Sequence, residues 1–202
     1  MAAVQRHAGQ SAASSWVTRF APLVPPGEVL DLACGSGRHA RLFAARGHAV
    51  LAVDRDATAL EQLAAHGDTA LTTLQFDLEA NPLPFAAGGV AATAWPFAAA
   101  RFAAIVVTNY LHRPLLPLIV ASLAPGGLLI YETFARGNAR FGKPSNPDFL
   151  LMPGELLRIA TKGGLAVVAF EEGVVSLPAP AVVQRICAMR PDGETVLPQS
   201  LG

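Results

Sequence analysis

Short apolar runs alternate with amphipathic segments along most of the chain. Seven runs have the length and the β-branched composition of strands, at residues 28–33, 49–54, 70–76, 102–109, 127–134, 165–172 and 181–190. The first five are almost continuously apolar, which is typical of parallel strands covered on both faces. Three segments between them have helical patterns that glycines close, at 38–46, 57–66 and 114–123, the last followed by the pair Gly126-Gly127. The alternation predicts a doubly wound α/β sheet.

The length of 202 residues fits one domain over 1–202. Some segments of this domain fall outside the alternation of strands and helices. We expect an N-terminal helical cover, an insertion rich in alanine and glycine, a lid loop and a flexible tail, at residues 1–25, 86–101, 135–151 and 191–202 in turn. Within the insertion, the run Trp95-Pro96-Phe97 is expected to act as an apolar anchor.

Charge and composition narrow the classes of partner. The chain has 15 Lys and Arg residues against 15 Asp and Glu residues and no basic cluster, so we expect no nucleic-acid partner. No apolar run approaches the roughly 18 residues that span a bilayer and no secretory signal precedes the first strand, so we expect a cytoplasmic protein without a membrane partner. Cys34 and Cys187 have no metal-ligand spacing, which predicts reduced thiols and no metal site. The oligomeric state stays open.

The first predicted strand ends in the stretch VLDLACGSGRHA, in which Gly35 and Gly37 fit the glycine pattern of dinucleotide-binding loops. Asp31 favours a different ligand. A dinucleotide places its pyrophosphate at the helix N-terminus, where a nearby carboxylate would repel it. S-adenosylmethionine instead carries an ammonium group and a sulfonium, which a carboxylate attracts. The structural alternative is that Asp31 caps the following helix and that the glycines only form a tight turn.

Two further acids follow neighbouring strands. Asp54 ends the second predicted strand, where its carboxylate can accept hydrogen bonds from ribose hydroxyls, in NAD as well as in S-adenosylmethionine. Asp77 follows the third strand, where it can accept from an adenine amino group. Because parallel strands end at one edge of a sheet, the three acids are expected to line one crevice.

These motifs resemble a known family. VLDLACGSGRHA, VDRD and FDLE are similar to motifs I, II and III of the class I S-adenosylmethionine-dependent methyltransferases, over about residues 26–190, with Ala33 in place of the first glycine. TNYLHR, LIYETF and the 135–151 segment are similar to small bacterial methyltransferases related to the tellurite-resistance type. The resemblance implies a Rossmann-like, doubly wound, seven-stranded and mostly parallel sheet with an antiparallel last strand. It also implies S-adenosylmethionine as cofactor, bound by Asp31, Ala33, Gly35, Gly37, Asp54, Arg55, Asp77, Leu78 and Asn109.

The acceptor side is expected at the end of the fourth strand, in Thr108-Asn109-Tyr110-Leu111-His112. The pattern Asn/Asp-Pro-Pro-Tyr/Phe of enzymes that methylate adenine or glutamine amides is missing there, which argues against those substrates. His112 is a candidate base, because imidazole titrates near neutrality, or else a hydrogen-bonded residue at the start of a helix. Tyr110 is a second catalytic candidate or lines the cofactor pocket.

An anionic small molecule is the substrate that the following segment favours. Tyr131 at the end of the fifth strand and the cations Arg136 and Arg140 of the 135–151 loop are the candidate substrate contacts, with an ordinary solvated loop as the alternative.

The leading hypothesis is methyl transfer from S-adenosylmethionine to a small molecule by in-line displacement, in which the protein mainly supplies alignment. An NAD(P)-dependent reductase is the first alternative. Asp31 opposes it, and so does the lack of a Tyr-x-x-x-Lys pair, because Pro114 and Ala135 stand four positions after Tyr110 and Tyr131. The second alternative is an S-adenosylmethionine-binding module without catalysis.

Overall fold

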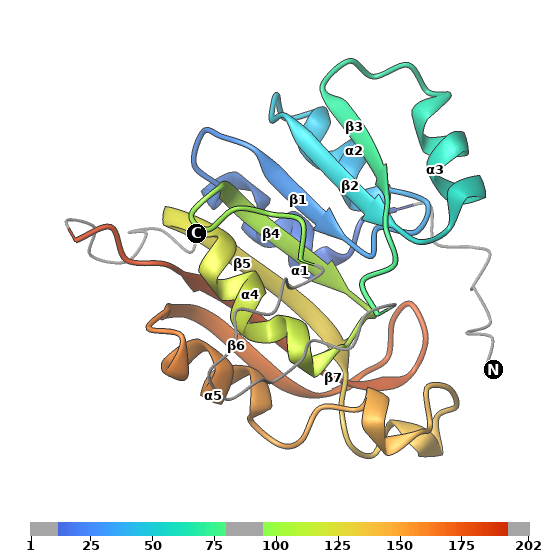
Figure 1. Ribbon diagram of the computed structural model, residues 1–202. Helices are drawn as coiled ribbons and strands as arrows, with labels where there is room; N and C mark the ends of the chain where they lie inside the picture. Colours follow the sequence, from blue (N-terminus) through green and yellow to red (C-terminus); the bar gives the residue numbers. More distant parts are fainter. Residues whose placement is uncertain (1–11, 80–94, 194–202) are drawn as a thin grey trace, which may run out of the picture.

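The computed structural model describes residues 12–79 and 95–193. One sheet of seven strands runs in the order β3-β2-β1-β4-β5-β7-β6 (Figure 1). Strands β1 to β5 pair in parallel, and β7 runs antiparallel to both of its neighbours, as predicted for the last strand. The strands are β1 (Val29–Leu32), β2 (Val50–Asp54), β3 (Leu71–Gln75), β4 (Phe102–Thr108), β5 (Leu123–Phe134), β6 (Ala166–Val175) and β7 (Ala181–Met189).

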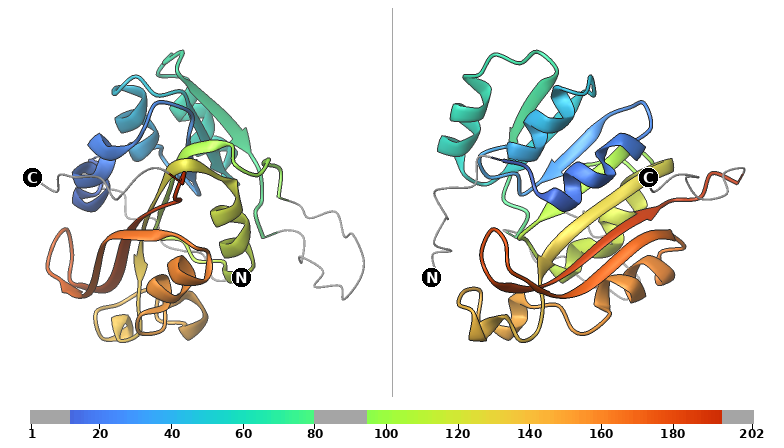
Figure 2. Two further views of the ribbon diagram at one scale, coloured as in Figure 1. Left: turned by 90° about the vertical axis from the view of Figure 1, so that its left-hand side faces the viewer. Right: turned by 180° about the vertical axis from the view of Figure 1, so that it is seen from behind.

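Helices cover both faces of the sheet (Figures 1 and 2). One face packs against α1 (Ser15–Phe20), α2 (Arg38–Ala44) and α3 (Ala57–Ala64). The opposite face packs against α4 (Leu116–Ser122) and α5 (Glu155–Lys162). Short 3-10 turns are η1 (Ala21–Leu23), η2 (Arg113–Leu115), η3 (Asn138–Arg140) and η4 (Pro147–Phe149). Two apolar cores therefore lie on either side of the sheet, and its carboxyl edge stays open to polar residues.

The third predicted helix differs from its expected form. It is split into η2 and α4, and it ends at Ser122, so the pair Gly126-Gly127 does not close it. Both glycines lie in β5, where the register with β4 shifts, and Gly126 has a φ of +75°. A Cβ at Gly127 would approach the carbonyl oxygen of Phe102 to 2.8 Å, so glycine is required by close strand contact.

Helix α5 is an element that the sequence analysis did not assign. Its boundary signals are nevertheless present: Glu155 stands in the first turn, Lys162 in the last, and Gly163 follows as the C-cap. The helix comes shortly after the long polar segment 135–151.

The segments outside the alternation are described in part. Helix α1 and η1 fall within the expected N-terminal cover. The indole of Trp95 donates to Ser122 Oγ at 2.9 Å, and Phe97 packs edge-on against Phe102, so this run is attached to α4 and β4. The expectations for 86–94 and for most of the tail lie outside the described residues. Within the described part of the chain, no helix is long and apolar enough to cross a bilayer.

Candidate functional site

The loop between β1 and α2 turns through three residues with positive φ: Ala33 at 54°, Gly35 at 54° and Gly37 at 70°. The two glycines differ in what surrounds them. A Cβ at Gly37 would collide with Leu63 of α3, so this glycine serves close packing. A Cβ at Gly35 would meet nothing within 4 Å. Gly35 is therefore the position of the loop whose backbone a ligand can approach.

Asp54 joins this loop to the end of β2. Its Oδ2 accepts a hydrogen bond from the backbone N–H of Gly35 at 2.7 Å, and its Oδ1 accepts from Asp56 N–H at 2.9 Å. A carboxylate has about four lone-pair sites, so Asp54 keeps capacity for ligand hydroxyls. The adjacent Arg55 is exposed, and its carbonyl accepts from the amide of Gln75. The structure thus brings the glycine loop after β1 into contact with Asp54 at the end of β2.

The remaining cofactor candidates lie at the same edge of the sheet. Asp77 follows β3, is exposed, and accepts from Glu79 N–H at 2.9 Å. Leu78 is half-buried against the core. Asn109 follows β4 with a φ of 55° and an exposed side chain, and its N–H donates to the carbonyl of Glu132. Their contact with a cofactor stays a prediction.

Asp31 is buried, with an exposed fraction of 1%. Its Oδ2 accepts from Ala40 N–H at 2.9 Å, so it caps the start of α2. Burial raises the pKa of Asp31 to about 7, although the Ala40 hydrogen bond and the nearby charge of Arg38 act in the opposite direction and Asp54 adds to the rise. Helix capping is observed, and a bound cation would favour the ionised form of the same carboxylate.

His39 lies buried beside the loop, in α2. Its Nε2 accepts from Ser14 N–H at 3.1 Å, so the neutral ring carries its proton on Nδ1, which faces Thr108 Oγ1 at 3.5 Å. Burial lowers the pKa of His39 to about 3, and the charge of Arg38 adds to this effect. His39 is therefore neutral at physiological pH and links the N-terminal segment and α2 to the end of β4.

Four polar side chains cross the sheet in pairing register at its carboxyl edge. We call them the polar row: Thr108 of β4, Glu132 of β5, Arg185 of β7 and Glu171 of β6. Arg185 Nε lies 2.6 Å from Glu132 Oε2, and Arg185 Nη1 lies 3.6 Å from Glu171 Oε2.

Helix α1 and the residue before it cover this row. Ser14 Oγ donates to Glu132 Oε1 at 2.9 Å, and Arg19 Nη1 lies 3.3 Å from Glu171 Oε1. Both arginines next to Glu171 lie about 6 Å from the ring of Trp16, at 5.9 Å for Arg19 and 6.0 Å for Arg185. The polar row is therefore closed on one side by an aromatic ring and ion pairs.

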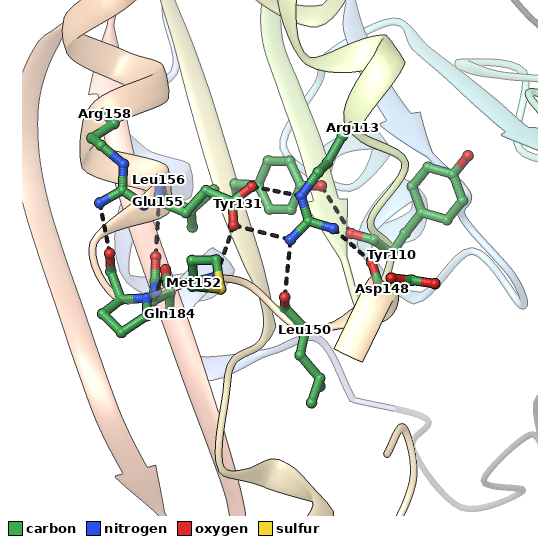
Figure 3. Close-up of polar contacts among 11 residues, drawn as sticks. Tyr110, Arg113, Tyr131, Asp148, Leu150, Met152, Glu155, Leu156, Arg158 and Gln184 are labelled. Carbon is green, nitrogen blue, oxygen red and sulfur yellow. Dashed lines mark hydrogen bonds and ion pairs between the residues drawn. The ribbon is translucent and has the colours of Figure 1, made fainter. Parts of the chain in front are cut away.

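The candidates Tyr131 and Tyr110 are linked to each other. Tyr131 is 1% exposed, and its hydroxyl is engaged, because it donates to the carbonyl of Tyr110 at 2.8 Å. The Tyr110 ring points away from Tyr131 (Figure 3). Burial, followed by the charge of Glu79, raises the pKa of Tyr110. Tyr131 thus fixes the backbone of the loop after β4, and the Tyr110 phenol stays protonated at neutral pH.

Arg113 clamps the far end of the 135–151 loop (Figure 3). Its guanidinium pairs with both carboxylate oxygens of Glu155, at 2.8 and 3.0 Å, and donates to the carbonyls of Asp148 and Leu150 at 2.7 and 2.9 Å. Glu155 Oε2 also accepts from Met152 N–H. The Arg113 guanidinium therefore links three segments: the loop after β4, the end of the 135–151 loop and the start of α5.

The 135–151 loop is also fixed at its start. Asn138 is 1% exposed, donates to the Pro144 carbonyl and accepts from Val182 N–H of β7, each at 3.0 Å. Arg136 and Arg140 are exposed, and the Arg140 guanidinium stacks on Phe141 at 4.7 Å. The loop is thus built around a buried amide, and its role as a lid stays a prediction.

His112 lies immediately before η2 and is half-buried. Its carbonyl accepts from Leu115 N–H, as expected at a helix start. No group of three or more His, Cys, Asp or Glu side chains that could hold a metal ion is present in residues 12–79 and 95–193.

Sequence reasoning missed the ion pair between Glu132 and Arg185 and the buried His39. A signal for the pair exists, because each charge interrupts an otherwise apolar strand, LLIYETF and AVVQRICAM. Two opposite charges in buried strands of one sheet indicate that they meet.

Replacing His39 by Gln tests its neutral state. Because the ring titrates near 6.5 when unfolded but near 3 in the fold, its contribution is complete above pH 6.5 and declines as pH falls below that value. The free-energy advantage of the wild type over His39→Gln should shrink by about 2 kcal/mol between pH 7.5 and pH 5 in urea unfolding. The exposed His66→Gln is the control and should show no such change. If the difference in free energy of unfolding between the wild type and His39→Gln is the same at all pH values, the assignment of a neutral, buried His39 is wrong.

Replacing Arg113 by Lys keeps the charge but removes the bidentate geometry. We expect the free energy of unfolding to fall by about 1–3 kcal/mol and tryptic cleavage after Arg136 and Arg140 to become faster. Arg101→Lys is the matched control, since Arg101 pairs with Glu28 in the same two-bond manner away from this loop. Equal cleavage rates in both variants would show that Arg113 does not hold the loop.

Residues 29–127 match a family described as a methyltransferase domain. TehB from Haemophilus influenzae superposes with a TM-score of 0.66 and 18% identity over 88% of this chain, which spans 62% of that one. A methyltransferase from Mesorhizobium loti superposes with a TM-score of 0.64 and 19% identity, over 88% of this chain and 98% of that one.

A further similar structure contains bound ligands. It is the Burkholderia thailandensis 1,6-didemethyltoxoflavin-N1-methyltransferase, with 1,6-didemethyltoxoflavin and S-adenosylhomocysteine bound, and it has a TM-score of 0.61 and 20% identity over 88% of this chain and 76% of that one. No curated protein matches by sequence. Residues 29–127 therefore match a methyltransferase domain, and the chain has the fold of these S-adenosylmethionine-dependent methyltransferases.

Proposed function

We propose that the chain transfers a methyl group from S-adenosylmethionine to a small-molecule acceptor by in-line displacement. The observation that carries the proposal is the joined edge of β1 and β2, where Gly35 N–H donates to Asp54 and the buried Asp31 lies below the same loop. The backbone turn at Gly35 is therefore accessible to a ligand and lies between the carboxylates of Asp31 and Asp54.

The residues present fit a cationic, phosphate-free nucleoside. Asp31 is a buried carboxylate that a positive charge would stabilise, Gly35 faces open space, and Asp54 has unused acceptor capacity. We assign the cofactor site to Asp31, Ala33, Gly35, Gly37, Asp54, Arg55, Asp77, Leu78 and Asn109. When bound, the cofactor supplies an electrophilic methyl group on its sulfonium.

The chain's own residues contribute mainly alignment, which is worth roughly 7–11 kcal/mol in favourable cases. The loop after β4 is held by the Asn109 N–H bond to Glu132 and by the Tyr131 hydroxyl on the Tyr110 carbonyl. His112 follows in this loop and is the proposed base for a protonated acceptor. Tyr110 can donate a proton in a hydrogen bond but does not act as a base, because its pKa is raised. Tyr131 is a positioning residue.

A small acceptor is supported by the ligand of the Burkholderia enzyme, which is a small heterocycle. The buried Asp31 remains unfavourable for the pyrophosphate of a nicotinamide cofactor. Arg136 and Arg140 stay proposed contacts of the acceptor at the loop surface, and turnover with labelled cofactor separates an enzyme from a binding module.

S-adenosylhomocysteine should raise the thermal midpoint of the protein, and NADPH should not. At 100 times its dissociation constant, a ligand of the native state adds about 2.7 kcal/mol. Asp54→Asn keeps the shape of the side chain but removes its charge, so affinity should fall about tenfold or more. Asp68→Asn, which alters a comparable turn carboxylate away from the site, should bind normally. Stabilisation by NADPH alone would overturn the assignment.

Cofactor binding should also release protons near neutral pH. Asp31 has a pKa of about 7 in the free protein, so an ammonium or sulfonium placed beside it should displace up to about half a proton at pH 7 and almost none at pH 8.5. Calorimetric titration with S-adenosylhomocysteine in phosphate and in Tris measures this difference. Asp31→Asn should abolish it, whereas Glu61→Gln on α3 should not. Identical heats in both buffers would place Asp31 away from the bound cation.

A further inference from the structure

A hollow of about 260 Å³ opens on the β6–β7 hairpin, lined by residues 171–175 of β6 and by Val183 and Arg185 of β7. Its position follows from the strand register. Arg185 pairs with Glu132, and Val183 pairs with Phe134 at the end of β5. The hollow therefore lies at the carboxyl edge of the parallel strands, the edge that carries the cofactor loop.

The hollow exists because one side chain is missing. Gly173 pairs with Val183, and a Cβ at Gly173 would meet nothing within 4 Å. Its neighbours on the same face of β6 are Glu171 and Val175, one polar and one apolar. The floor is therefore backbone, with a valine on one side and the polar row on the other.

The polar row connects this hollow with the cofactor loop. Arg185 is paired with Glu132, Glu132 accepts from Ser14, and Ser14 N–H donates to His39 directly after the loop. Strands lie about 4.8 Å apart, so Arg185 on β7 is roughly 10 Å from Thr108 on β4, two strands away. A molecule that binds in the hollow and extends to the end of β4 must therefore be about 10 Å long.

The charges at the hollow disfavour an anion. Arg185 is engaged by Glu132 and Glu171 together, and Glu171 is shared with Arg19. Glu172 also belongs to the lining, but its carboxylate lies on the opposite face of β6, where it accepts from Gly154 N–H and from the amide of Gln184. The Glu171 side chain is 51% exposed and that of Arg185 is 15% exposed, so an amine would find an accessible carboxylate, whereas an oxyanion would find a guanidinium that is buried and paired.

We propose that this hollow is a subsite for the non-reacting end of the methyl acceptor, and that it takes an amine with an apolar flank in preference to an oxyanion. The inference rests on the proposed methyl transfer to a small molecule. It gives the acceptor a class: an elongated, uncharged or cationic amphiphile about 10 Å long. It also moves the main selectivity away from the cations of the 135–151 loop.

The test uses three probes of matched shape, phenethylamine, phenethyl alcohol and 3-phenylpropanoate, titrated into the full chain with S-adenosylhomocysteine present. Binding is followed by calorimetry and by the indole N–H signal of Trp16, which lies beside Arg185. The amine should bind best and the carboxylate worst. Glu171→Gln should weaken the amine about tenfold and strengthen the carboxylate, because it removes one charge and releases Arg185. Structural damage would weaken both probes.

Two variants locate the binding. Val183→Phe fills the hollow and should abolish binding of all three probes, whereas Leu177→Phe, at an 80% exposed hairpin position outside the lining, should leave it unchanged. Affinity for S-adenosylhomocysteine should be the same in every variant. Absence of probe binding, tighter binding of the carboxylate than of the amine by the wild type, or full binding by Val183→Phe would overturn the subsite. Loss of S-adenosylhomocysteine binding by the wild type would instead overturn the proposed function.

Discussion

The buried carboxylate of Glu132 is the interaction on which the carboxyl edge of the sheet depends. Two separate parts of the chain contact this carboxylate, Ser14 before α1 and Arg185 on β7. The backbone carbonyl of Glu132 also accepts a hydrogen bond from Asn109 N–H after β4. A buried charge without partners costs several kcal/mol, so these segments are held in place together. Glu132 therefore couples the N-terminal cover, the loop after β4 and the hairpin into one rigid edge.

Asp31 is the counterpart of Glu132 on the same face of the sheet. Glu132 has an arginine within ion-pair distance, whereas Asp31 has a backbone N–H and more distant charges. Burial raises the pKa of Asp31 to about 7. A buried carboxylate without an ion-pair partner lowers the stability of the ligand-free protein at neutral pH. A cation bound nearby would stabilise its ionised form. The edge thus contains one carboxylate that is paired within the fold and one that, under the proposed function, a cationic ligand would balance.

Sequence patterns predicted the strands, and the shared edge of the sheet at which the candidate acids lie, for a simple reason. Near-continuous apolar runs mark parallel strands, and their carboxyl ends meet at one edge, which places Asp31, Asp54 and Asp77 together. Because nearly all positions of these strands are apolar, the sequence does not show on which face of the sheet a given side chain lies. Tyr131 and Glu132 are neighbours on opposite faces, and β5 shows no alternation that could assign them. The pairing of Glu132 with Arg185 further depends on a register that only the folded sheet defines.

The two tryptophans of the chain lie on opposite faces of the sheet. Trp95 is bonded to Ser122 next to α4, and Trp16 lies beneath the two arginines that flank Glu171. Indole emission responds to nearby charge and to water, so each ring reports on a different environment. Trp16 is consequently an internal fluorophore at the junction of α1 with the hairpin. Movements of that junction are open to optical detection without any attached label.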